Sequence, residues 1–138
     1  MISKTSVDGI KALALLACLP AGECEGAVHI ASTIGAPANY LGKSLQSLAA
    51  EGLVISRRGQ GGGFFLAKLP SEISLFDVIC ALEDVSRFSK CILGFDECKE
   101  SSPCPLHNRW KGVREIYLNF LKKTTIAELL SNTTNKPI

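Results

Sequence analysis

Apolar residues recur at helical spacing in three stretches of the first fifty residues, and glycine or proline follows the first two. The first stretch is residues 6–18, ended by Pro20-Ala21-Gly22, and the second is residues 28–34, closed by Gly35. The third starts at Pro37 or Ala38 and runs through Glu51. Apolar positions three and four apart predict amphipathic helices, and Gly and Pro mark their ends. Two short helices joined by a Gly-containing turn predict a helix-turn-helix.

The period then changes from helical to extended. Residues 53–57 and 64–67 are predicted to form two strands, and the segment between them is Arg58-Gly59-Gln60-Gly61-Gly62-Gly63. Such a pattern predicts a hairpin with a flexible, basic tip. A helix-turn-helix followed directly by a basic hairpin is the order of a winged helix. We therefore predict a mostly α fold with a small β-hairpin wing, in which residues 1–70 form a winged helix-turn-helix DNA-binding domain.

The second half carries a different pattern. After Pro70, Ser74 and Asp77 have capping-box spacing ahead of an apolar helix that ends near Glu83. A cysteine-rich loop is predicted at about 88–107 and a long C-terminal dimerisation helix at about 105–123, so residues 71–138 form a second module. One side of this helix is too apolar for a lone surface helix, and pairing with its copy gives a homodimer. The alternative is that Trp110 and Phe120 pack on the protein's own first domain.

Charge is divided unevenly between these modules. The net charge of the 138 residues is only +2, which does not by itself indicate nucleic-acid binding. Residues 29–69 nevertheless carry four bases against Glu51 alone, whereas residues 70–104 carry seven acids and three bases. A basic first module followed by an acidic one suits a DNA reader joined to a module that does not read DNA.

The composition predicts a globular cytoplasmic protein with no membrane partner. The apolar run at 12–19 is too short to span a bilayer, and the N-terminus lacks the pattern of a signal peptide. In a reducing compartment, cysteines are more often metal ligands, redox sensors or buried apolar residues than disulfides. Of the six cysteines, Cys18 and Cys80 lie on predicted apolar helices and are expected to be packed in the core. Cys24 stands between two glutamates, where a lowered thiol pKa is not expected.

The other cysteines are clustered. Cys91, Cys98, Cys104 and His107 have the spacing C-x6-C-x5-C-x2-H. Three thiolates and an imidazole can complete a four-ligand site on a soft metal. Four interpretations are open: an iron–sulfur cluster, zinc, a thiol–disulfide switch without metal, or unrelated cysteines.

The run of residues 29–83 resembles the core of the Rrf-two (Rrf2) family of bacterial regulators, whose members include IscR and NsrR. The matching pieces are Tyr40-Leu41, Gly52-Leu53-Val54, the wing Arg58-Gly59…Gly62-Gly63, and Ile73-Ser74-Leu75. The resemblance extends over nearly the whole chain. It implies a transcriptional regulator, not an enzyme, that binds double-stranded DNA at a palindromic operator as a homodimer.

The third helix is long enough to enter the major groove, where its N-terminal half meets base edges. Its exposed polar candidates are Asn39, Tyr40, Lys43, Ser44 and Gln46. Tyr40 has an alternative role in the core, and Lys43 an alternative role as a phosphate contact. The resemblance gives Arg58 a place in the minor groove. Arg57 is expected to contact phosphate, and Gly61 lies in the glycine run that brings the wing close to the DNA backbone.

The resemblance favours an iron–sulfur cluster, because members use three cysteines at this place. His107 matches the histidine of two-iron IscR-like members. Asp8 matches the aspartate that NsrR-like members supply to a four-iron cluster from the partner subunit. The first gap of six residues departs from both patterns. We favour two irons with His107 as the fourth ligand; the alternative is that His107 is an ordinary helix-surface histidine.

The predicted function is therefore that of a transcriptional regulator, most simply a repressor. Its operator binding would be controlled by a cluster that senses redox state, nitric oxide or iron supply. The alternatives are a zinc-bound or thiol–disulfide-switched regulator of the same fold, and an iron–sulfur electron carrier.

Overall fold

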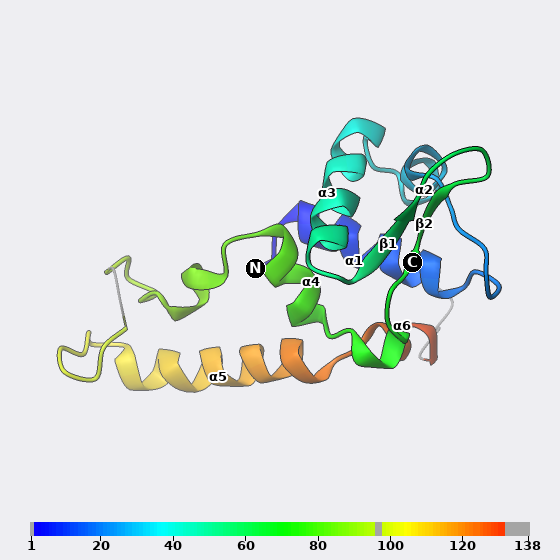
Figure 1. Cartoon of the computed structure of the whole chain (residues 1–138). Helices are drawn as coiled ribbons and strands as arrows, with labels where there is room; N and C mark the ends of the chain where they lie inside the picture. The colour runs from blue at the N-terminus through cyan, green and yellow to red at the C-terminus, as the bar shows by residue number, and fades with distance from the viewer. Residues whose placement is uncertain (1, 96–97, 132–138) are drawn as a thin grey trace.

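The protein was analysed as a computed structural model that describes residues 2–95 and 98–131 (Figure 1). Its α-helices are α1 (Lys4–Ala17), α2 (Ala27–Ile34), α3 (Ala38–Ala50), α4 (Leu75–Leu82), α5 (His107–Lys123) and α6 (Ile126–Ser131). Two strands, β1 (Val54–Arg57) and β2 (Gly63–Leu66), and two short 3-10 helices, η1 (Pro70–Glu72) and η2 (Val85–Ser89), complete it. The predicted mostly helical fold with one β-hairpin is confirmed. Residues 96–97 of the predicted loop and 132–138 of the predicted second module lie outside the described residues.

The helix-turn-helix forms where local signals place it. The Ser3 hydroxyl accepts a hydrogen bond from the Ser6 N–H and caps α1. Gly35 ends α2 in the left-handed conformation (φ 74°), which glycine adopts without a steric penalty. Pro37 then precedes α3, where its fixed φ suits the start of a helix. These two ends bring α2 and α3 together as the predicted helix pair.

The hairpin is held by the connection between α1 and α2. β1 and β2 pair antiparallel with Val54 opposite Leu66 and Arg57 opposite Gly63. The Glu25 backbone then pairs with Phe64 through two hydrogen bonds of 3.0 and 2.8 Å. A Cβ at Gly63 would lie 2.4 Å from the Glu25 carbonyl oxygen, so only glycine permits this approach. The wing is thus attached along one edge to residues just before α2.

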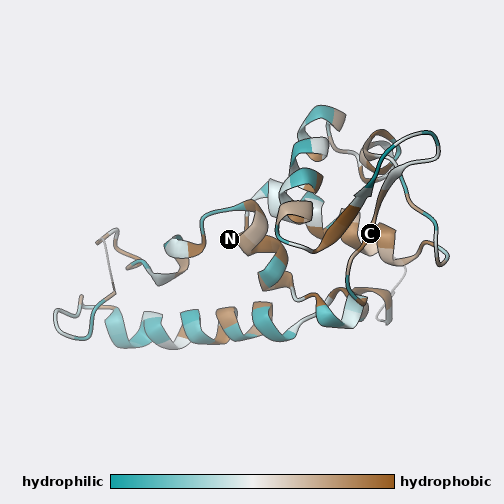
Figure 2. Cartoon of the chain, in the orientation of Figure 1, coloured by the Kyte–Doolittle hydropathy of each residue, from teal (hydrophilic) through white to brown (hydrophobic). Residues whose placement is uncertain are grey.

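A single core joins both halves of the sequence. Leu13 of α1 and Leu45 of α3 are fully buried, and they belong to the same cluster as Val78, Leu121 and Ile126 from the second half. Figure 2 shows the apolar segments turned toward this centre and the more polar face of α3 turned away from it. The chain after α5 returns to the start of α4, because Leu75 N–H donates to Thr124 O and Ile126 N–H donates to Ile73 O. The helix-turn-helix therefore packs on residues from the C-terminal part of the chain.

Two details differ from expectation. The predicted loop at 88–107 overlaps η2, and α5 begins at His107. Cys18 and Cys80 are exposed, so the prediction that they pack in the core is wrong. Cys18 is the C-cap residue of α1, and Cys80 lies on the side of α4 away from Val78 and Ile79. The capping box of Ser74 and Asp77 is confirmed.

Among residues 2–95 and 98–131, no helix is both long and apolar enough to cross a membrane.

We expect Gly63→Ala to lower the free energy of unfolding by about 1–3 kcal/mol, because the added methyl meets the Glu25 carbonyl and the backbone leaves its favoured conformation. Urea unfolding followed by circular dichroism measures the change. Gly112→Ala is the matched control, since a Cβ there meets nothing within 4 Å. Equal stability of the two variants would contradict the attachment of the wing to Glu25.

Candidate functional site

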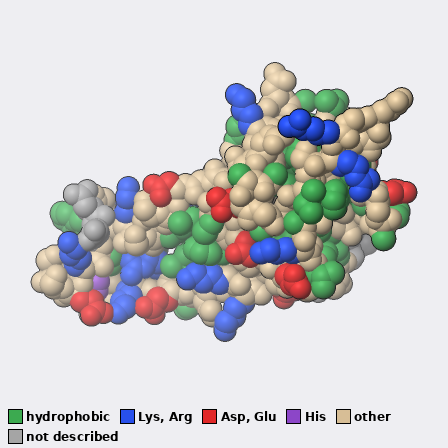
Figure 3. All heavy atoms as spheres, viewed as in Figure 1, with side chains coloured by type: hydrophobic (Ala, Val, Ile, Leu, Met, Phe, Trp, Pro, Cys, Tyr) green, Lys and Arg blue, Asp and Glu red, His purple; other side chains and the backbone are tan. Residues whose placement is uncertain are grey.

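The outer face of α3 presents polar side chains away from the core. Asn39, Lys43 and Gln46 are exposed and follow one another at spacings of four and three residues. Tyr40 is 41% exposed, so its side chain lies partly on this surface and partly against the protein. Figure 3 shows Lys and Arg side chains around the end of the molecule formed by α3 and the hairpin. Exposed polar and basic side chains on a helix are of the kind that contacts base edges and phosphates of DNA.

Ser44 does not belong to that surface. Its side chain is only 5% exposed, and its hydroxyl donates a 3.2 Å hydrogen bond to the Tyr40 carbonyl. It shares the inward face of α3 with Leu41, Leu45 and Leu48. The expectation that Ser44 is an exposed candidate for reading bases is therefore corrected, because the helical period turns it toward the core.

The hairpin contains both predicted arginines, and they have different surroundings. Arg58 and Gly61 are exposed at the turn beyond β1. Arg57 Nη1 instead donates to the Gly22 carbonyl at 3.1 Å, and its guanidinium carbon lies 5.2 Å from the centre of the Phe65 ring. The Cys24 thiol donates to the Gly61 carbonyl at 3.0 Å. The tip of the wing is thus connected to the segment before α2.

The predicted metal ligands come together in one small pocket at the end of the molecule away from the wing. Its lining includes the Cys91, Cys98, Cys104 and His107 side chains. They form two close pairs: the Cys91 and Cys104 sulfurs lie 3.3 Å apart, and Cys98 Sγ lies 3.1 Å from His107 Nδ1. His107 is 5% exposed, so it is not an ordinary surface histidine. The start of α5 supplies the imidazole and the preceding loop supplies the thiols.

The first of these pairs is electrostatically unequal. The Leu93 backbone N–H, helped by the Cys104 thiol and the Phe95 N–H, lowers the pKa of Cys91. The hydrogen bond to Cys91 raises the pKa of Cys104, and burial raises it further. Cys91 is therefore the sulfur of this pair that loses its proton first. Thiolate is the form in which cysteine binds a metal or attacks a disulfide.

The donor set fits a soft metal, although the donors are paired with one another as they stand. Within the described ranges, no three His, Cys, Asp or Glu side chains surround a common centre that would hold a metal ion. Three sulfurs and one imidazole are nevertheless the ligand types that zinc and iron–sulfur clusters use. The chemistry of the four groups fits either cofactor, provided that the sulfurs separate.

Asp8, the other predicted ligand, lies elsewhere. Both of its carboxylate oxygens accept from Lys4 Nζ, at 3.1 and 2.9 Å, and the residue is 1% exposed. It is on the first helix and does not line the cysteine pocket of its own chain. Its carboxylate has a partner within α1, and the i,i+4 spacing of Lys4 and Asp8 is the sequence signal that could have indicated it.

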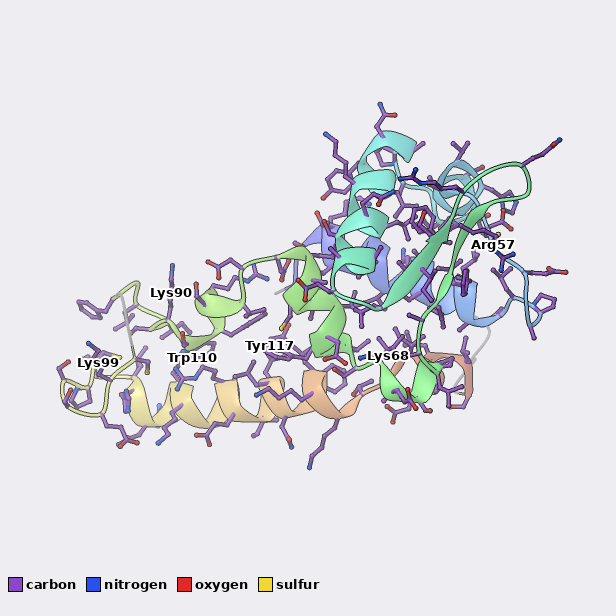
Figure 4. All side chains as sticks on the ribbon, in the orientation of Figure 1. Arg57, Lys68, Lys90, Lys99, Trp110 and Tyr117 are labelled. Carbon is purple, nitrogen blue, oxygen red and sulfur yellow. The ribbon has the colours of Figure 1, made fainter. Side chains whose placement is uncertain are left out.

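Polar contacts among the described residues fasten the cysteine loop to η2 and α5. Cys98 N–H donates to Ser89 O at 3.3 Å, and Trp110 Nε1–H donates to Lys90 O at 3.2 Å. Lys111 forms an ion pair with Glu100 on the loop. Figure 4 shows Trp110 and Tyr117 on the side of α5 that faces this segment. The backbone at Ser89 and Lys90 therefore connects the pocket with the body of the molecule.

Glu83 extends this connection to α1, and the sequence analysis did not identify this residue. Its Oε1 accepts from Arg87 Nη2 at 2.7 Å, while Oε2 accepts from the backbone N–H of Ser3 at 3.1 Å. Ser3 is the residue that caps α1. One carboxylate thus bridges η2 and the N-terminus of α1. Its separation of eighty residues from Ser3 explains why no local pattern indicated it.

Next to the side of α5 that faces η2, the helix carries an exposed apolar stripe. Val113, Ile116 and Phe120 are 57%, 74% and 54% exposed and lie three and four residues apart. Beside it is a pocket of about 360 Å³, whose walls include Phe88, Trp110 and Tyr117. Large side chains in such a row are typical of an interaction surface on a protein.

Comparisons with known proteins agree with this architecture. IscR of Serratia proteamaculans is 35% identical over 111 residues, covering 78% of this chain and 67% of that protein. The solved structure of CymR (YrzC), described as the global cysteine regulator of B. subtilis, superposes with a TM-score of 0.82 at 28% identity. It matches 97% of this chain and 98% of its own. T. potens IscR gives a TM-score of 0.77 at 25% identity, covering 98% of this chain and 89% of that one.

The family comparison covers most of the chain. Residues 2–132 match the Rrf2 model, described as an iron-dependent transcriptional regulator. The chain thus has the winged helix of helix-turn-helix transcriptional regulators, and these relatives are regulators rather than enzymes. The chain belongs to the Rrf2 family.

Proposed function

We propose that this regulator controls its DNA binding through an iron–sulfur cluster held by Cys91, Cys98, Cys104 and His107. The observation that carries the proposal is the convergence of these four donors in one pocket. The family description as iron-dependent supports iron over zinc. A two-iron cluster agrees with the burial of His107 beside Cys98, whereas Asp8 is paired with Lys4 in its own chain. When bound, the cluster supplies a group whose redox state and occupancy respond to oxidants, nitric oxide or iron supply.

The residues around the pocket supply a route to the reading head. A displacement of Cys98 acts on Ser89 through their backbone hydrogen bond, and Ser89 follows Arg87 and Phe88 in η2. Arg87 holds Glu83, which in turn holds the capped end of α1. Because α1 packs against α2 and α3, a shift at η2 changes the position and orientation of these two helices. Repression of transcription follows if the operator-binding state lies across a promoter.

On the DNA side, α3 enters the major groove with Asn39, Lys43 and Gln46, and Arg58 enters the minor groove from the wing. The exposure of all four residues supports this placement. We propose that the stripe on α5 joins two copies, so that residues 1–70 of each copy form one reading head and residues 71–138 carry the sensor and the dimer contact. Two heads related by twofold symmetry read a palindromic operator.

A thiol–disulfide switch without metal is the second candidate. The 3.3 Å separation of the Cys91 and Cys104 sulfurs and the lowered pKa of Cys91 favour it, because a thiolate beside a thiol is the arrangement from which an oxidant forms a disulfide. The same route through Ser89 and Glu83 would carry that signal.

The reading helix can be tested with DNA selected from a random duplex library. Asn39→Ala should weaken binding to the selected operator by about 1–3 kcal/mol and relax base preference at one position per half-site. Ser44→Ala is the matched control from the same helix, and it should leave base preference unchanged because Ser44 faces the core. If Ser44→Ala changed base preference and Asn39→Ala did not, the assignment of the DNA-contacting face of α3 would be wrong.

The cluster can be tested by purification without oxygen. Wild-type protein should be brown, with absorption above about 400 nm, and Cys98→Ala should be colourless. Operator affinity should differ between the cluster-loaded and cluster-free wild type by about tenfold or more, and Cys98→Ala should behave as the cluster-free form. Cys18→Ala, which removes an exposed thiol outside the pocket, should behave as wild type.

Two other results would reject this proposal. A colourless wild-type protein that contains zinc would replace the cluster by a metal without redox chemistry. A colourless, metal-free protein that forms a Cys91–Cys104 disulfide on mild oxidation and then changes its operator affinity would establish the thiol switch instead.

The dimer contact can be tested by placing a charge on the stripe. Ile116→Glu should weaken self-association by about tenfold or more, because an unpaired carboxylate would be buried in the interface. Lys122→Glu, which places the same carboxylate at an exposed position on the opposite side of the helix, is the control. Sedimentation equilibrium of the two variants measures the effect. Identical association constants would show that the copies do not meet through Ile116.

A further inference from the structure

The attachment of the wing tip to the connection between α1 and α2 gives Arg57 a role that its sequence position does not suggest. An arginine next to Arg58 in a basic hairpin is expected to contact a phosphate. In the structure its Nη1 donates to the Gly22 carbonyl, and Cys24 Sγ lies 4.0 Å from the same nitrogen. These contacts point the guanidinium toward the protein's own loop (Figure 4).

The geometry of the hairpin explains why Arg57 reaches this loop. Arg57 pairs across the strands with Gly63, which has no side chain, and Phe65 is the diagonal neighbour. The guanidinium carbon lies 5.2 Å from the centre of the Phe65 ring, within the range of a cation–π contact. The ring therefore supports the planar group while one of its N–H donors meets the Gly22 carbonyl. A lysine ammonium lacks the planar shape that makes both contacts together.

The loop that Arg57 contacts is continuous with the reading helices. Residues 22–26 lead directly into α2, and Glu25 pairs with Phe64, which lies opposite Ser56, one position from the turn of the hairpin. The Glu25 carboxylate also pairs with His29 in the first turn of α2. The turn end of the wing is thus fixed to the segment before α2 by the Glu25 backbone and, beside it, by Arg57 and Cys24.

We propose that Arg57 is a positioning residue, which tethers the wing to the segment before α2 and so sets the distance between Arg58 and the reading face of α3. This inference rests on the proposed reading of DNA by α3 and Arg58. DNA binding to a freely moving wing would have to order it first, and this conformational cost weakens binding without removing any contact to DNA. The tether places two adjacent arginines in separate roles.

Salt dependence separates this role from a phosphate contact. The slope of log K against log salt concentration falls by about 0.9 for each phosphate contact that is lost. We expect Arg57→Gln and Arg57→Lys both to weaken operator binding about five- to tenfold, which corresponds to the loss of about one hydrogen bond. Both variants should keep the salt-dependence slope of the wild type. Arg58→Gln is the matched control and should reduce the slope by about 0.9 per reading head.

Amide exchange in the free protein tests the tether without DNA. The Glu25 and Phe64 amides should exchange about five- to tenfold faster in Arg57→Gln and Arg57→Lys than in wild type, while the amides of α1 keep their protection. Unchanged exchange at Glu25 and Phe64 would overturn the inference. So would full recovery of operator affinity in Arg57→Lys together with a reduced slope in Arg57→Gln, since both results define a phosphate contact.

The two proposals fail in different ways. A wild-type protein that selects no sequence from a random duplex library would reject the reading of DNA by α3. Faster exchange in the Arg57 variants would still establish the tether in that case. Normal exchange combined with sequence-specific binding would reject only the tether.

Discussion

The structure depends on the packing of α1 at the centre of the molecule. Buried side chains of α1 meet α2 and α3 on one side and α4 and α6 on the other. The chain closes on itself where Ile126 N–H donates to Ile73 O and Leu75 N–H donates to Thr124 O. The helix-turn-helix therefore shares its core with α4, α6 and the end of α5. A close-packed core of this kind transmits a displacement rather than absorbing it.

The cysteine loop is less buried and less tightly packed than this core. It contributes Cys91 to the buried residues but leaves Ile92, Leu93 and Phe95 about half exposed. Its order rests on a few polar contacts, among them those of Ser89, Lys90 and Glu100. A segment with little apolar burial gains much of its order from what binds to it. A ligand for the thiols would therefore change the conformation of this loop more than that of the helix-turn-helix. Glu83 contacts the N-terminus of α1 and so links the two.

The sequence was sufficient for features that depend on local signals. Gly35, the capping box of Ser74 and Asp77, and the change to extended spacing after Gly52 predicted helix ends and the hairpin within a few residues. The spacing of three cysteines and His107 predicted the group that lines the pocket. Features that depend on distant partners were missed. The contact between Glu83 and Ser3 is one of them, because no local pattern joins residues eighty positions apart. The error at Ser44 was of another kind, because the spacing of Leu41 and Leu48 already places Ser44 on the inward face of α3.

The two wing arginines show the same limit at the scale of one residue. Their side chains are identical and adjacent, so composition and charge assign both to DNA. What separates them is the partner that each can reach. Arg57 is the last residue of β1 and has the Phe65 ring and the Gly22 carbonyl beside it, whereas Arg58 begins the turn. A winged helix needs its wing held in place as well as charged, and a strand-end arginine over an aromatic ring serves the first need because its Nη1 already donates to the protein's own backbone.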